Sequence, residues 1–384
     1  MTTAQFDATS TEALALLTEY RPETPFFFAS PRGTIATEGR LFTVPADRDL
    51  PSAVRGVLDL AADDGHDDPI VVGAVPFDSH TEPRLSVPLR AYRAGPLPNR
   101  ITAPSTPTSA GARTVEVPVG AAYVEGVRRA VARLRAGELD KVVLARALDV
   151  TTDSAIDIGL LLRHLAARDP AGYTFAVDLA AGTLVGNSPE LLVSRRGDMV
   201  TANPLAGSLP RSADPIEDFG QAQALLASRK DRREHALVAE AVGDALRPFC
   251  TDVEVPAEPS LLRTAAMWHL STVVRGRVAD PAISSLTLGA ALHPTPAVCG
   301  TPTGDARAAI AEYEGFDRGF YTGMVGWENA TGDGEWVIAL RCAVTQGRTA
   351  RLYAGAGIVA DSDPAAELAE TTAKFRTMLA GLGL

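Results

Sequence analysis

The chain has 384 residues, of which 46% are hydrophobic and 22% are charged, a composition typical of soluble globular proteins with a large buried core. The formal net charge of −11 argues against nucleic acid or an anionic membrane as a partner. A small anionic substrate remains compatible with this charge, provided that a few basic side chains or a metal ion form its site locally.

The cysteines and the first residues bear on cellular location. Cys250, Cys299 and Cys342 share no metal-type spacing, and such a sparse, odd set is typical of a reducing compartment. Residues 1–10 lack the basic start and apolar stretch of a signal peptide. No apolar run is long enough to span a bilayer. We therefore expect a cytoplasmic protein with no membrane contact.

One irregular stretch divides the sequence. Residues 95–114 (GPLPNRITAPSTPTSAGART) are rich in Pro, Ser, Thr and Gly, which favours a crossing segment over a packed element. We interpret this stretch as a seam within a single domain spanning residues 1–384. It would separate an N-terminal subdomain, residues 1–105, from a catalytic part, residues 115–384.

Hydrophobic periodicity and turn residues predict a mixture of strands and helices. In chain order, we expect a buried strand at 70–75, a helix at 122–136, a strand at 141–150, a helix near 156–167, a strand-rich stretch at 173–202, two helices between about 215 and 249, strands at 336–345 and 351–356, and a final helix beginning at Asp363 and Pro364. Because these elements show no regular βαβ alternation, the sequence predicts an α+β fold. Large, mostly antiparallel sheets would be flanked by helices, with the active site between them.

Two residues could supply acid–base chemistry. Lys141 opens a strand of valines and leucines, where partial withdrawal from water can prepare an amine as a general base. Glu190 follows Pro189 and precedes an apolar run, so its carboxyl group could have a raised pKa and act as a general acid. The simpler interpretations are a strand-edge lysine in solvent and a turn glutamate facing water. Taken singly, each residue favours the simpler interpretation.

Two further carboxylates could bind a metal ion. Glu234 lies three residues after Asp231, the spacing of a helix capping box, but hard carboxylates together with substrate oxygens would also suit magnesium. Glu370 and Lys374 are four residues apart on the predicted final helix and share one face. They could form an ordinary surface ion pair, or Glu370 could point toward a metal and Lys374 toward a substrate carboxylate.

One arginine and two glycine clusters could contact an anionic ligand. Arg341 lies within the apolar run at 337–344, and a buried arginine needs an anionic partner. The glycines in the runs at 205–208 and 353–357 would let backbone N–H groups approach a ligand closely. Tight turns between strands would explain both clusters equally well.

In combination and order, these segments resemble the chorismate-utilising enzyme family, which includes isochorismate, salicylate, anthranilate and aminodeoxychorismate synthases. The matching segments, which run from Lys141 to Lys374, are KVVLARALDV, GNSPELLVSR, PLAGS, SRKDRREHALV, MWHLST, ALHPTPAVCGTP, FDRGFYTGMVGW, ALRCAV, RLYAGAGIV and AETTAK. The N-terminal third carries little of the resemblance. What the resemblance implies is the family's fold, a magnesium cofactor and chorismate as the small-molecule substrate.

The resemblance also implies roles for individual residues. Lys141 matches the lysine that activates water, which the ammonia-using members lack, and Glu190 matches the acid that protonates the departing C4 hydroxyl. Glu234 and Glu370 match the two magnesium carboxylates. The matches to substrate-binding positions are Arg341, Lys374 and the backbone at Gly355, and Gly207 and His269 fall in matching active-site segments.

These roles imply an isomerase reaction in which water attacks C2 on one face of the ring while the C4 hydroxyl leaves from the other. Lys141 and Glu190 are therefore expected on opposite faces of the ring. Magnesium would neutralise the ring carboxylate, which nearby glutamates would otherwise repel.

The segment at 292–300 (LHPTPAVCG) is similar to isochorismate synthases of the siderophore type, with Ala297 and Val298 as small walls beside the ring. Salicylate synthase is the alternative, because it shares the lysine and the acid but then eliminates pyruvate. Ser208 and Leu209 replace the Thr-Arg pair often found after the glycine, which leaves the local substrate contacts open.

An alternative from another class is a catalytically silent relative that binds carboxylates or a partner subunit, since ammonia-using relatives work with a separate glutaminase. The complete set of Lys141, Glu190, Glu234 and Glu370 argues against silence. We therefore expect a water-using enzyme that acts as a monomer, without a glutaminase subunit. The pathway that it serves stays open.

Overall fold

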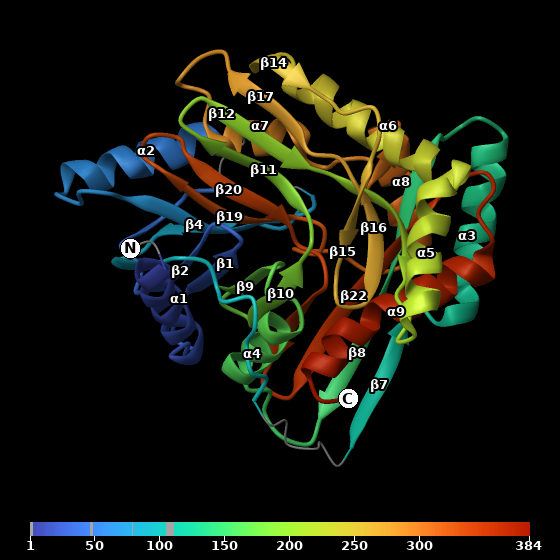
Figure 1. The fold of residues 1–384 in the computed structure, drawn as a ribbon, viewed down its shortest axis with the longest axis horizontal. Coiled ribbons are helices and arrows are strands. Elements are labelled where there is room, and N and C mark those ends of the chain that lie inside the picture. Colours follow the sequence, from blue (N-terminus) through green and yellow to red (C-terminus); the bar gives the residue numbers. More distant parts are fainter. Residues whose placement is uncertain (1–2, 47–48, 79, 105–110) are drawn as a thin grey trace.

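The computed structural model describes residues 3–46, 49–78, 80–104 and 111–384. Within these residues the strands form sheets of ten, nine and three strands, and the paired strands are antiparallel throughout. Helices cover the outer faces of the two large sheets (Figure 1). The predicted α+β fold with large antiparallel sheets is confirmed.

The ten-stranded sheet brings the start, the middle and the end of the chain together. Its spatial order is β18 (Gly300–Thr301), β8 (Lys141–Thr152), β22 (Thr349–Ile358), β21 (Cys342–Gln346), β10 (Thr183–Ser188), β9 (Tyr173–Asp178), β1 (Phe26–Ser30), β2 (Gly33–Glu38) and β6 (Arg90–Ala94), with β7 (Ala112–Val117) also paired to β8. The longest pairing joins β8 to β22 from Val142 opposite Ile358 to Thr151 opposite Thr349.

The nine-stranded sheet has the order β14 (Cys250–Glu254), β17 (Val274–Val278), β12 (Met199–Asn203), β11 (Leu191–Arg196), β20 (Gly334–Ile338), β19 (Met324–Asn329), β4 (Ile70–Val75), β5 (Arg84–Val87) and β3 (Phe42–Thr43). The small sheet consists of β13 (Leu205–Pro210), β16 (Met267–Ser271) and β15 (Ser260–Arg263). Strands from residues 1–105 therefore complete both large sheets. The division of the chain at residues 95–114 stays a proposal; part of that seam, residues 105–110, lies outside the described residues, and β7 begins inside it.

The alternation of side chains along each strand explains the layers. Phe26 and Phe28 belong to the apolar core between the large sheets, together with Phe175. Phe27, which points the other way, packs with helices on the outer face of the ten-stranded sheet. Those helices are α1 (Thr3–Thr18), α4 (Ile158–Arg168) and α9 (Pro364–Gly381). The outer face of the nine-stranded sheet is covered by α2 (Leu50–Asp63), α6 (Arg229–Leu246) and α7 (Ser285–Leu292).

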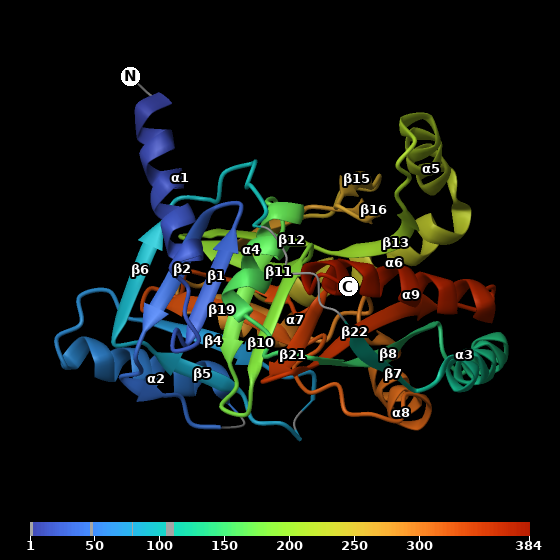
Figure 2. The same cartoon turned by 90° about the horizontal axis from the view of Figure 1, so that it is seen from below.

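The remaining helices lie at one end of the molecule. Helices α3 (Gly120–Arg135) and α8 (Thr303–Tyr313) form a further apolar core with the start of β8. Helix α5 (Pro215–Ala227) projects from the body beside the small sheet (Figure 2). No helix among the described residues is long and apolar enough to cross a membrane.

One predicted strand is wrong. The expected strand at 336–345 is two strands: β20 ends at Ile338 in the nine-stranded sheet, and β21 begins at Cys342 in the ten-stranded sheet. Between them Arg341 has φ 48°, in the left-handed region that residues other than glycine seldom adopt. Periodicity could not reveal this break, because both strands are buried apolar runs. The two glycine clusters also lie inside strands, β13 and β22, rather than in turns.

Candidate active site

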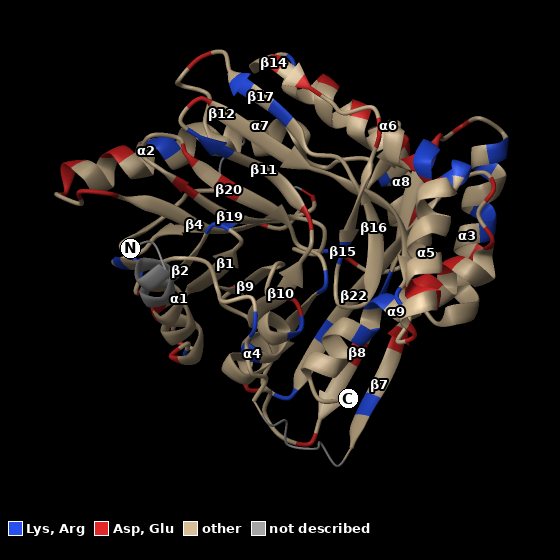
Figure 3. Ribbon diagram, in the orientation of Figure 1, with Lys and Arg blue, Asp and Glu red and all other residues tan. Residues whose placement is uncertain are grey.

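A pocket with an empty volume of about 830 Å³, its open mouth included, lies among β8, β22, β13, β16, α6 and α9. Figure 3 marks Lys, Arg, Asp and Glu residues mainly on the helices, with others along the strands. The pocket is lined by all the predicted site residues: Lys141, Glu190, Gly207, Ser208, Glu234, His269, Ala297, Val298, Arg341, Gly355, Glu370 and Lys374. The fold thus brings one set of chemical groups together from segments far apart in sequence.

Lys141 is buried rather than solvated. Its side chain is 1% exposed, and Nζ lies 2.9 Å from Glu234 Oε1. Gly357, on the neighbouring strand β22, leaves the space for this ion pair. A Cβ atom at residue 357 would lie 2.4 Å from Glu234 Oε1 and 3.1 Å from Lys141 Cε. The solvent-exposed alternative for Lys141 is therefore excluded.

The capping-box interpretation of Glu234 is also wrong. Helix α6 begins after Ser228, whose side chain accepts a hydrogen bond from the backbone N–H of Asp231 (3.2 Å). Asp231 therefore occupies the first turn of the helix, and Glu234 lies in the second turn. Because side chains three and four apart share a helix face, Asp231 and Glu234 both line the pocket, together with Lys230.

Glu190 lies between β10 and β11 and is 3% exposed. Burial raises the pKa of its carboxyl group to about 7, against the opposing effects of the Leu205 backbone N–H and of Lys141, Arg341 and Lys374. A turn glutamate facing water is therefore excluded. A carboxyl group with this pKa carries a proton for much of the time at neutral pH, so it can act as an acid.

Glu370 and Lys374 do form the predicted ion pair, but they form it inside the pocket. Glu370 Oε1 lies 2.6 Å from Lys374 Nζ and accepts a hydrogen bond from Ser208 Oγ (3.1 Å). Burial opposes ionisation of Glu370, yet Lys374, Ser208 and Arg341 hold its pKa below the usual value. Lys374 also donates to the backbone carbonyl of Gly355 (2.8 Å).

Two buried polar side chains in the pocket lining have unused hydrogen-bonding capacity. Arg341 Nη2 and His269 Nε2 have no hydrogen-bond partner among the described residues. Burial, together with the charges of Arg341 and Lys374, lowers the pKa of His269 well below its usual value, so the ring is neutral. Unpaired buried polar atoms that face one pocket indicate a polar ligand.

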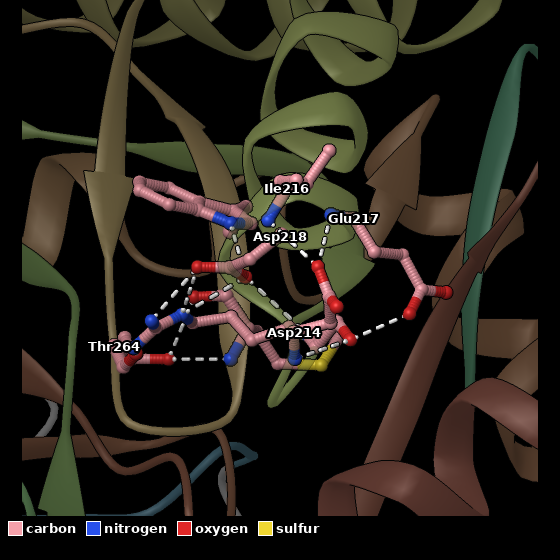
Figure 4. A network of polar contacts seen from close by, with 9 residues as sticks. Asp214, Ile216, Glu217, Asp218 and Thr264 are labelled. Carbon is pink, nitrogen blue, oxygen red and sulfur yellow. Dashed lines mark hydrogen bonds and ion pairs between the residues drawn. The ribbon is translucent and has the colours of Figure 1, made fainter.

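The small sheet covers one side of the pocket, and a network of polar contacts joins this sheet to α5. Asp218 on α5 pairs with Arg211, which follows β13, at 2.9 Å, and accepts a hydrogen bond from Trp268 Nε1 on β16 at 3.0 Å (Figure 4). The hydrogen bonds from Arg211 are the main reason why the pKa of Asp218 falls to about 2. Gly207, on the small sheet, has φ 76°, and a Cβ there would meet Asp231 Cβ at 3.0 Å.

Sequence reasoning missed five charged or aromatic residues in the lining: Lys230, Asp231, Glu367 and the stacked Tyr321 and Tyr353. Burial and the nearby Glu370 charge raise the pKa of Glu367 to about 6. Its position one helical turn before Glu370 was an available signal.

Lysine usage was a second available signal. Only three of the 36 lysine and arginine residues are lysines, namely Lys141, Lys230 and Lys374. All three line the pocket, and each pairs with a glutamate there, Glu234, Glu367 and Glu370 respectively. Arginine is a fixed charge with a rigid fork of donors, whereas lysine can give up its proton when buried. In a chain whose other basic residues are arginines, a lysine therefore indicates a position where an amine is needed in place of a guanidinium group.

The carboxylates in the lining fit a hard divalent cation. Asp231, Glu234, Glu367 and Glu370 all line the pocket, and the pKa of Asp231 is raised by burial and by the charges of Glu234 and Glu370. No cluster of three metal-binding side chains is formed within the described ranges. A cation held by two carboxylates would keep coordination positions for water and substrate oxygens, as magnesium does in proteins.

Comparison with known proteins agrees with this geometry. Residues 96–383 match the family described as chorismate binding enzyme. Isochorismate synthase DhbC of Bacillus subtilis is 49% identical over 389 residues, covering 98% of both chains. The vibriobactin-specific isochorismate synthase of Vibrio cholerae is 42% identical over 365 residues, covering 94% of this chain and 92% of that relative.

Solved structures show the same relationship. The structure described as the 2,3-dihydroxybenzoate-specific isochorismate synthase DhbC of Bacillus anthracis has a TM-score of 0.93 and 49% identity, covering 97% of this chain and 100% of that chain. Anthranilate synthase component I of Streptococcus pneumoniae shares the fold, with a TM-score of 0.74 at 22% identity. This chain belongs to the chorismate-binding enzyme family.

Proposed function

We propose that this chain is an isochorismate synthase, an isomerase that converts chorismate to isochorismate. The observation that carries the proposal is a buried amine, Lys141, and a buried carboxyl group of raised pKa, Glu190, in one pocket of a family member. Relatives with near-complete coverage bear the name of this activity.

Lys141 and Glu190 have complementary tasks in this reaction. Lys141, in its amine form, takes a proton from water as the water oxygen bonds to C2. The ring double bonds shift, the bond between C4 and its hydroxyl oxygen breaks, and Glu190 protonates the departing hydroxyl. Atoms balance, because one water enters and one water leaves. The anti geometry of attack and departure requires Lys141 and Glu190 to lie on opposite faces of the ring.

The substrate carboxylates would use the spare donors of the pocket. Arg341 Nη2 and His269 Nε2 are buried and unpaired in the part of the chain that the structure describes, and Lys374 lies on the same pocket wall as Gly355, to which it donates. Val298 is buried and Ala297 half-buried, so both present small apolar surfaces to a ring. Gly207 and Ser208 complete the proposed binding set from the small sheet.

Glu234 and Glu370 would hold Mg²⁺, which when bound neutralises the ring carboxylate. The charges in the lining support this assignment. With Glu190 protonated and Lys141 in its amine form, the four acidic groups Asp231, Glu234, Glu367 and Glu370 exceed the three cationic groups Lys230, Lys374 and Arg341 by one charge. A dicarboxylate substrate would add two further negative charges, and one divalent cation would offset two charges of this excess.

The decisive experiment is to incubate the protein with chorismate and Mg²⁺, without ammonia, and to separate the products by chromatography. Isochorismate alone is the expected product. Salicylate with pyruvate would replace the proposal with the salicylate synthase alternative, which uses the same base and acid. Binding of chorismate without any turnover would favour the catalytically silent relative.

The proposal extends to the enzyme's setting. We propose a role in siderophore biosynthesis, because relatives specific for vibriobactin or 2,3-dihydroxybenzoate are similar over nearly the whole chain. A cytoplasmic location is consistent with three buried, free cysteines. We further propose a monomer without a glutaminase subunit, since Lys141 provides for water rather than ammonia as the nucleophile.

A further inference from the structure

The edge of β8 beside Lys141 has a gap in its strand pairing. β18 pairs with β8 only at Lys141 and Val142, and β7 begins its pairing at Ala147. Between these two strands the edge of β8 faces no strand in the described structure. Buried backbone groups need hydrogen-bond partners, so this gap must be filled by other means.

A buried ion pair fills the gap. Glu314, directly after α8, accepts a hydrogen bond from the backbone N–H of Ala145 (2.7 Å), and Arg318 Nη2 donates to the backbone carbonyl of Val143 (2.8 Å). Arg318 Nε also donates to Glu314 Oε2 (2.9 Å). Glu314 is 1% exposed and Arg318 is 2% exposed. The two side chains therefore take the place of a missing strand.

The same guanidinium also holds two walls of the pocket. Arg318 Nη1 donates to the backbone carbonyl of Val298 (2.7 Å) and to Thr322 Oγ1 (3.2 Å). Val298, Thr322 and Val143 all line the pocket, whereas Arg318 itself does not. The planar fork of arginine can make these contacts together, and the single ammonium group of lysine cannot.

We propose that Arg318, with Glu314, is a positioning residue that sets the strand of Lys141 against the wall formed by Val298. This proposal rests on the proposed function, because the positioning matters only if Lys141 acts as the base. It adds a residue outside the pocket to the machinery of the reaction, acting through Lys141. A displacement of about 1 Å in a reacting group can lower turnover about 100-fold.

The test removes both charges at once, because a single buried charge left unpaired could unfold the chain. The variant is Glu314→Leu with Arg318→Met. Its matched control is Arg195→Met with Asp333→Leu, a second buried arginine that donates to backbone carbonyls, those of Gly197 (2.9 Å) and Ile283 (2.5 Å), and lies near an aspartate. None of these control residues lines the pocket.

We expect kcat of the Glu314/Arg318 variant to fall by about 10- to 100-fold, with KM changed by less than about threefold. Amide hydrogen exchange at Ala145 should accelerate. The control should lose comparable melting temperature while keeping kcat within about twofold of the original. Arg318→Lys, which keeps the charge but loses the fork, should lower kcat without rescue.

Equal kcat in the two paired variants, or unchanged exchange at Ala145, would overturn the positioning role. Failure of the proposed function is distinguishable from this result. If the unmodified chain does not convert chorismate, the function is wrong, and exchange at Ala145 still decides whether the ion pair holds β8.

Discussion

Two buried ion pairs flank the same strand and differ in what their donors do. Lys141 and Glu234 face the pocket, whereas Arg318 and Glu314 lie at the edge of β8 between β18 and β7. Both cations are almost fully buried. Arg318 uses its donors on Glu314, on two backbone carbonyls and on one hydroxyl. Lys141 has Glu234 as its ion-pair partner, beside a pocket that can admit a ligand.

This difference separates a positioning pair from a reacting one. A buried cation whose donors are all occupied can hold backbone segments but has nothing left for a substrate. A buried lysine with spare capacity beside a pocket can exchange a proton with a ligand. Burial alone therefore does not identify a catalytic charge; unused hydrogen-bonding capacity that faces a pocket is also required.

The largest effect is expected when the ion pair of Lys141 and Glu234 is broken. Lys141→Ala should lower turnover of chorismate by about 1,000-fold, because no base remains to accept the proton of water. Chorismate binding, followed by equilibrium titration, should change by less than about threefold. Lys141→Arg sharpens the comparison: it keeps the charge but cannot act as a base, so it should be equally inactive. Equal losses of binding and turnover would count against the role as base.

A second prediction concerns the acid opposite this base. Because Glu190 must donate a proton and burial raises its pKa to about 7, kcat should fall as pH rises through about 7. The charges of Lys141, Arg341 and Lys374 face Glu190 and oppose this shift. Glu190→Gln should lower kcat by about 100-fold and remove that alkaline limb. An alkaline limb that persists in the variant would assign the titration to another group.

A third prediction tests the partner of Lys141. Glu234→Ala should raise the Mg²⁺ concentration needed for half-maximal rate by about 10- to 100-fold, since one of two proposed carboxylate ligands is lost. Direct titration with Mg²⁺ in the absence of chorismate should show the same weakening. Glu314→Gln provides the contrast from the positioning pair and should leave the Mg²⁺ requirement unchanged. If Glu234→Ala also leaves it unchanged, Glu234 serves only as the counter-ion of Lys141.

The smallest effect is expected from a substitution that fills the space beside the ion pair of Lys141 and Glu234. Gly357→Ala would place a methyl group against Glu234 Oε1 and Lys141 Cε, so we expect kcat to fall by about tenfold. Gly220→Ala, on α5, is the matched control, because a Cβ there meets nothing within 4 Å. Full activity of Gly357→Ala would show that the Lys141–Glu234 contact is not needed for turnover.

Sequence patterns predicted most elements because each depends on local residues. The strand at 70–75 is β4, and the final helix starts at Pro364 after the capping residue Asp363, whose side chain accepts a hydrogen bond from the N–H of Ala366. Local rules failed where a neighbour decided the outcome. The Asp231–Glu234 spacing fits a capping box, but Ser228 caps the helix and leaves Glu234 free to meet Lys141.

By itself, the sequence determined the family, the α+β class and twelve of the residues that line the pocket, because ordered motifs and apolar periodicity are properties of the chain. Only the tertiary structure decided which charges are buried and which charges meet. It broke the expected strand at Arg341 so that the chain passes from one sheet to the other. It also placed Arg318 and Glu314 in the gap of β8. The physical reason is that desolvation and ion pairing depend on neighbours supplied by distant segments, which no local pattern encodes.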